Sequence, residues 1–222
     1  YSVVCSVAAI NLLAVAIRET VKGQAVKVVS LDCEWDTDKN ADGQVTKSYK
    51  VALIQLGYRN LEGTIRAALF QISRLRILPT GLSDIFRDQE ITFVGVGVAG
   101  NLKKIGRDLE CAVLTSKTRY INLGMYARER DVVQDGTVGM EYLVERVLNQ
   151  KLDKSAQVRL SKWSRTDLSL LQKDYAALDA MKPLETCFKM SSLPDLNSRL
   201  GPDAALPEME VDVVPKHGHA PD

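Results

Sequence analysis

Two acidic residues, Asp32 and Glu34, carry the first chemistry that the sequence suggests. They follow residues 25–31, a short run rich in β-branched residues that is typical of a buried strand. Side chains two positions apart in a strand share a face, so both carboxylates should lie side by side at the end of this strand. Because like charges repel unless a hard cation such as Mg²⁺ lies between them, the pair suggests a metal site. In isolation, the same pattern more often begins a solvated loop.

A second candidate lies far downstream, where Tyr175 and Asp179 fall within residues 167–189. The apolar spacing of this segment predicts a helix, and positions four apart on a helix share a face. A phenol beside a metal-bound carboxylate can orient an attacking water molecule. Tyr175 could equally be a half-buried core residue, because this spacing is common in helices.

Glycines at positions 95, 97 and 100 match the pattern G-x-G-x-x-G, between a predicted strand (91–96) and a helix that begins near Asn101. The pattern invites a dinucleotide-binding interpretation, and hence a nucleotide-dependent oxidoreductase. We do not favour it, because the pattern follows a hairpin of strands and no acidic residue ends a second strand about twenty residues later.

The remaining periodicity predicts an α/β domain over residues 1–190. Further strands are expected at 49–56, 67–72 and 119–123, and helices at 8–21 and 139–148. An Asp-Gly turn signal in the polar stretch after residue 35 favours a hairpin between the first two strands. Residues 191–222 are rich in Pro, Asp and Glu, which indicates a disordered tail or linker.

Taken together, these motifs resemble the DEDD superfamily of 3′–5′ exonucleases, in its tyrosine-bearing branch of Werner-syndrome-type and RNase D-type domains. The resemblance spans residues 26–189 and includes the D-x-E pair, the segment from Gly95 through Asn101 to Asp108, and the Tyr175 and Asp179 helix. It implies an RNase H-like mixed five-stranded sheet flanked by helices.

The resemblance also implies hydrolysis assisted by two Mg²⁺ or Mn²⁺ ions. Asp32 would bridge the ions, Glu34 and Asp179 would complete the first metal site, and Tyr175 would orient the attacking water. The substrates would be the 3′ ends of DNA or RNA, and the products nucleoside 5′-monophosphates.

Asn101 stands where this family has its remaining aspartate. An asparagine keeps one carbonyl oxygen but removes a negative charge, so the second metal should bind more weakly. An inactive nuclease-like module that binds nucleic acid or a protein partner, an enzyme with reduced or Mn²⁺-dependent activity, and a laboratory substitution remain open. Asn101 could also serve only as the N-cap of a helix that begins at Leu102.

The balance of 29 Lys and Arg against 28 Asp and Glu means that any nucleic-acid surface must be a local patch. The candidate contacts are Trp35 beside the acidic pair and nearby basic residues: Lys103, Lys104, Lys154, Arg159 and Lys162. The four scattered cysteines and the poor match of residues 3–17 to a signal peptide or membrane span favour an intracellular protein, nuclear or cytoplasmic rather than secreted. We expect a piece of a longer chain with further domains or partners.

Overall fold

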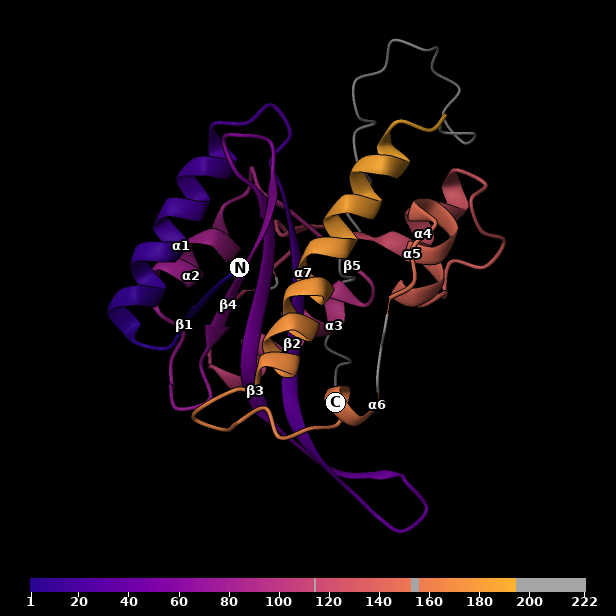
Figure 1. Cartoon of the computed structure of the whole chain (residues 1–222). Helices are drawn as coiled ribbons and strands as arrows, with labels where there is room; N and C mark the ends of the chain where they lie inside the picture. The colour runs from indigo at the N-terminus through magenta and orange to yellow at the C-terminus, as the bar shows by residue number, and fades with distance from the viewer. Residues whose placement is uncertain (114, 153–155, 195–222) are drawn as a thin grey trace, which may run out of the picture.

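A computed structural model describes residues 1–113, 115–152 and 156–194 of the chain (Figure 1). Its strands are β1 (Ser2–Val4), β2 (Val28–Lys39), β3 (Val45–Arg59), β4 (Ile65–Gln71), β5 (Thr92–Gly95) and β6 (Arg119–Asn122). Its helices are α1 (Val7–Lys22), α2 (Thr80–Arg87), α3 (Val98–Asp108), α4 (Leu123–Glu129), α5 (Met140–Leu148), α6 (Ala156–Arg159) and α7 (Leu170–Ser191). Every predicted strand and helix is present, with shifted ends.

The strands form one mixed sheet in the order β1-β4-β3-β2-β5-β6. β2, β3 and β4 form an antiparallel meander, while β5 and β6 continue the sheet in parallel with β2. The α/β fold is confirmed, but the expected count of five strands is wrong. The sixth strand, β1, pairs with β4 over three residues, and a strand that short has too few positions for a recognisable alternation.

Helices cover both faces of the sheet. On one face α1, α2 and α3 enclose the largest apolar core with β2, β3 and β4. On the other face α7 crosses the meander, and α4 and α5 pack against the C-terminal half of α7 (Figure 1). The residues of β2 therefore alternate between an apolar core and the underside of α7.

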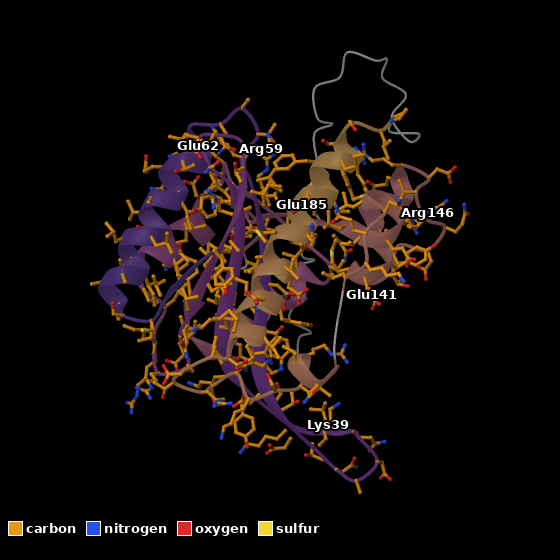
Figure 2. The ribbon with its side chains drawn as sticks, viewed as in Figure 1. Lys39, Arg59, Glu62, Glu141, Arg146 and Glu185 are labelled. Carbon is orange, nitrogen blue, oxygen red and sulfur yellow. The ribbon has the colours of Figure 1, made fainter. Side chains whose placement is uncertain are left out.

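β2 continues well past the acidic pair, so the expectation that the pair ends this strand is wrong. β2 and β3 pair as far as Lys39 and Val45, with irregular register after Glu34, and form a hairpin that projects from the body (Figures 1 and 2). The predicted turn is present at residues 40–44, where Asn40 Oδ1 accepts a hydrogen bond from the Gln44 backbone at 2.9 Å. The two carboxylates consequently lie mid-strand, where pairing with β3 fixes their backbone.

α7 is held at a defined position over the sheet. Ser169 caps its first turn in a capping box with Gln172. Further along, the Ser30 hydroxyl donates to the Ala180 carbonyl and accepts from the Gly57 backbone at 3.0 Å. This contact requires glycine at position 57, because a Cβ there would lie only 2.3 Å from the Ala180 oxygen. The close approach fixes the register of α7 against β2.

Two predictions fall outside the described residues. They are the tail, from residue 195 onward, and Lys154. Among the helices that the structure describes, none is long and apolar enough to cross a membrane.

Candidate active site

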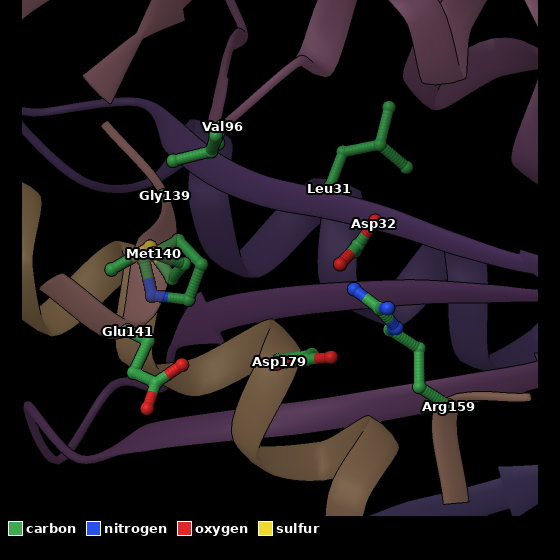
Figure 3. A pocket seen from close by; sticks show the side chains of 10 residues that line it. Leu31, Asp32, Val96, Gly139, Met140, Glu141, Arg159 and Asp179 are labelled. Carbon is green, nitrogen blue, oxygen red and sulfur yellow. The ribbon is translucent and has the colours of Figure 1, made fainter. Parts of the chain in front are cut away.

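Asp32 and Asp179 meet in a pocket of about 380 Å³ between β2, β5, α5 and α7 (Figure 3). Asp32 is partly exposed on β2, whereas Asp179 is buried on the face of α7 that covers the sheet. Glu34 lies two residues along β2 and is only 9% exposed. The pocket is lined by Leu31, Asp32, Gly95, Val96, Gly139, Met140, Glu141, Arg159, Asp179 and Pro183. The fold thus brings carboxylates from distant parts of the sequence to one place.

Asn101 contacts the same carboxylate. Its side-chain nitrogen donates a hydrogen bond to Asp32 Oδ1 at 2.9 Å, and the Cys33 backbone donates to the same oxygen at 2.8 Å. Asn101 lies inside α3, whose N-cap is Gly97 with a left-handed φ of 69°, so the N-cap explanation for Asn101 is wrong. The amide instead donates an N–H group to the Asp32 carboxylate.

Tyr175 lies beside these carboxylates and is 7% exposed. Its ring lies against Trp163, with ring centroids 6.0 Å apart. Burial raises the pKa of the Tyr175 phenol well above its ordinary value, and the charges of Asp179, Glu34 and Asp32 raise it further, as does a hydrogen bond with Asp179. The phenol therefore holds its proton more tightly than a free tyrosine does, and its hydroxyl is available as a hydrogen-bond donor.

The donor set fits a divalent cation. Asp32, Glu34 and Asp179 all lie close enough to raise the pKa of Tyr175, and carboxylate oxygens are the donors that Mg²⁺ and Mn²⁺ prefer. Within the part of the chain that the structure describes, however, no three Asp, Glu, His or Cys side chains close around one point as a finished metal site. Nitrogen donors face the carboxylates instead: the Asn101 amide contacts Asp32, and Arg159 points toward Asp32 in Figure 3.

Pocket residues Glu141 and Arg159 add opposite charges to this site. Arg159 was expected to contact phosphate, and the structure places it in the lining of this pocket. No motif singled out Glu141, because an acidic residue in the first turn of a helix is common. Only the packing of α5 against α7 brings Glu141 to this place.

The expected nucleic-acid contacts divide into surface and buried residues. Lys103 and Lys162 are exposed. Lys104 is only 7% exposed, and its ammonium contacts Asp108 at 2.9 Å and the Tyr49 carbonyl at 2.7 Å. Lys104 also lies 4.6 Å from the centre of the half-buried Trp35 ring. Lys104 is therefore buried and paired inside the protein, and its ammonium is not exposed for a phosphate contact.

The glycine pattern has a structural explanation. A Cβ on Gly95 would lie 2.9 Å from the Leu31 carbonyl of the neighbouring strand, and Gly97 begins α3 in the left-handed region. These glycines allow β5 to approach β2 and the chain to turn into α3, next to the pocket that Gly95 lines.

Replacement of Tyr175 by phenylalanine tests the role of the phenol. Tyr175→Phe keeps the ring on Trp163 but removes the hydroxyl, so we expect the rate of hydrolysis at this site to fall about 10-fold to 100-fold with the fold intact. Because the phenol stays protonated, the pH–rate profile of the parent chain should show no alkaline limb from Tyr175. Initial rates between pH 6 and 10 on both proteins measure this. A parent rate that follows phenol ionisation in this range would contradict the donor role.

Comparison with known proteins defines the class. The family model described as 3′–5′ exonuclease matches residues 8–193. The chain belongs to this family, and its mixed sheet flanked by helices is the fold of a 3′–5′ exonuclease domain.

The individual relatives are much longer proteins than this chain. The chain is 31% identical over 168 residues to the bifunctional 3′–5′ exonuclease/ATP-dependent helicase WRN of Mus musculus, covering 76% of this chain and 11% of that protein. It is 32% identical over 158 residues to exonuclease 3′–5′ domain-containing protein 2 of Mus musculus, covering 69% of this chain and 22% of that protein. The chain therefore spans less than a quarter of either relative.

Solved structures share the fold. RNase D of Escherichia coli, an exoribonuclease, superposes with a TM-score of 0.62 at 22% identity, covering 86% of this chain and 44% of that chain. The Nibbler EXO domain of Aedes aegypti superposes with a TM-score of 0.59 at 18% identity, covering 86% of each chain.

Proposed function

We propose that this chain removes nucleotides one at a time from the 3′ ends of DNA or RNA and releases nucleoside 5′-monophosphates. The observation that carries the proposal is the meeting of Asp32 and Asp179 at one pocket, with the Tyr175 phenol hydrogen-bonded to Asp179 beside it. Together with the family match, this arrangement supports hydrolysis of a phosphodiester bond.

Asp32, Glu34 and Asp179 would hold divalent ions, with Asn101 at the remaining ligand position as a single neutral oxygen donor. Two Mg²⁺ or Mn²⁺ ions would supply an activated water and stabilise charge on the leaving oxygen. A solved structure of Brucella melitensis NrnC, with 15% identity to this chain, contains bound Mg²⁺. To coordinate an ion through its oxygen, the Asn101 side chain would have to rotate its nitrogen away from Asp32.

The residues around the pocket suit the sugar–phosphate backbone of a strand end. Tyr175 would donate its hydrogen bond to the attacking water or a phosphate oxygen, and Arg159 would pair with phosphate. Exposed Lys103 and Lys162 are further candidates for phosphate contacts, and Trp35 for stacking. These contacts read no base identity, so the proposal covers both DNA and RNA. Brucella melitensis NrnC has also been solved bound to pGG.

The wider setting is also a proposal. Since the chain spans 11% and 22% of two relatives, we propose that it works inside a longer protein, with further domains or a protein partner, in the nucleus or cytoplasm.

Digestion of a single-stranded oligonucleotide labelled at its 5′ end tests the proposed activity. With Mg²⁺ or Mn²⁺ we expect a ladder of products shortened from the 3′ end, and with EDTA we expect none, because the carboxylates alone cannot activate water. An oligonucleotide blocked by a 3′-phosphate provides a control for polarity.

The nature of the products separates the alternatives. Release of the label first as a mononucleotide would indicate the opposite polarity and would contradict the proposal. Intact oligonucleotide in every condition, with and without the Asn101→Asp substitution, combined with retained binding, would favour the nuclease-like binding module.

A further inference from the structure

Gln55 lies at the centre of β3, directly opposite Asp32 of β2 in the register of the sheet. Residues directly opposite in an antiparallel pair have their side chains on the same face, with Cβ atoms about 5 Å apart. The Gln55 amide therefore has the reach to approach the Asp32 carboxylate.

The face that these two residues share is the one that α7 covers. Two positions away on the same strands, Ser30 lies opposite Gly57, and both contact Ala180 of α7. In the other direction, Leu53 packs in one cluster with Tyr175. Gln55 is thus enclosed below the turn of α7 that carries Tyr175 and Asp179.

The Gln55 side chain is fully buried and has polar atoms that nothing nearby satisfies. Its exposed fraction is 0%, and neither its amide nitrogen nor its amide oxygen has a hydrogen-bond partner among the described residues. Its neighbour on the other side, Leu69 of β4, offers only an apolar side chain. A leucine or methionine would fill this position without the cost of burying an unpaired amide. Because Gln55 lies beside Asp32, its amide is placed to act on the Asp32 carboxylate.

We propose that Gln55 is a positioning residue of the carboxylate site, and that its amide holds Asp32, through one bound water molecule, in the orientation that a divalent cation requires. Residues that orient metal ligands typically change metal affinity by 10-fold to 100-fold when they are replaced. This inference rests on the proposed metal-dependent function.

Gln55→Met tests the role without emptying the space, because methionine has a similar volume and no amide. Binding of Mn²⁺ is measured directly by the loss of the free Mn²⁺ electron paramagnetic resonance signal. We expect the affinity for Mn²⁺ to fall about 10-fold, and the midpoint of urea unfolding to stay equal or to rise, because a buried unpaired amide is removed. In cleavage, kcat should fall while KM for the oligonucleotide stays unchanged.

Thr186→Val is the matched control. The Thr186 hydroxyl is also fully buried and lacks a partner within the described part of the chain. It lies on α7 seven residues beyond Asp179, about 10 Å along the helix. This variant should match Gln55→Met in stability but keep the Mn²⁺ affinity of the parent chain.

The outcomes distinguish the proposed role of Gln55 from the proposed metal-dependent function. If the parent binds Mn²⁺ and Gln55→Met binds it equally well, the role of Gln55 is overturned while the proposed function stands. If the parent chain neither binds Mn²⁺ nor cleaves, the proposed function fails and the inference fails with it. Gln55→Leu provides the same measurement should the methionine variant not fold.

Discussion

Asn101→Asp is expected to raise the rate of nucleotide release about 100-fold at saturating Mg²⁺, which corresponds to about 2.7 kcal/mol of added transition-state stabilisation. The substitution replaces the side-chain nitrogen, which donates to Asp32 Oδ1 at 2.9 Å, with a carboxylate oxygen. It therefore converts a contact between an amide and a carboxylate into a contact between two carboxylates. A divalent ion between them would gain a charged ligand where it now has an amide.

The same substitution should make folding depend on the metal. Without a divalent ion, two carboxylates this close repel, and Asp32 loses a hydrogen-bond donor at a position where residue 101 is only 8% exposed. We expect the free energy of unfolding to fall by about 2 kcal/mol in EDTA and to recover in millimolar Mg²⁺. The parent chain should show a smaller response to Mg²⁺.

Oligonucleotide digestion and urea unfolding, each with Mg²⁺ and with EDTA, measure both effects. Asn40→Asp is the control for an added charge, because Asn40 lies in the exposed hairpin turn and its Oδ1 acceptor is retained. Equal cleavage by the parent and by Asn101→Asp would mean that the amide is tolerated at this ligand position. A variant that gains neither metal response nor cleavage would contradict the two-metal site.

Gly57→Ala is expected to reduce the free energy of unfolding by about 4 kcal/mol and to abolish cleavage. A Cβ at this position would lie 2.2 Å from the Ser30 hydroxyl and 2.3 Å from the Ala180 carbonyl. Both atoms are buried, and one belongs to the backbone of a long helix, so relief requires α7 to move away from the sheet. Since Asp179 precedes Ala180, that movement would also separate Asp179 from Asp32.

Urea unfolding of Gly57→Ala beside Gly100→Ala measures this effect. Gly100 lies in the first turn of α3, and a Cβ there meets nothing within 4 Å. Gly100→Ala should therefore stabilise the chain by about 0.5–1 kcal/mol, because alanine favours helix more than glycine does. If Gly57→Ala were as stable and as active as the parent, the close packing of α7 would not be what positions Asp179.

Much of the fold could be predicted because local patterns specify it. The β-branched runs and the helical spacing located strands and helices correctly, since burial of one face imposes a period on the sequence. The ends were less predictable: β2 continues through Asp32 and Glu34 to Lys39, because pairing with β3 extends a strand into polar residues that have no apolar signal. α3 likewise begins at Val98 rather than near Asn101, because Gly97 supplies the turn.

The sequence by itself determined the class of this protein, most of its strands and helices, and the candidate site residues, including Asp32, Tyr175 and Asp179. These follow from residue types and spacing, which local geometry converts into shared faces. Only the tertiary structure decided that Asn101 donates to Asp32, that Lys104 is buried with Asp108, and that the Gln55 amide beneath α7 has no partner among the described residues. Each of these contacts depends on segments that are distant in the sequence packing together. Such a contact produces no hydrophobic periodicity in the sequence, so the sequence alone does not reveal it.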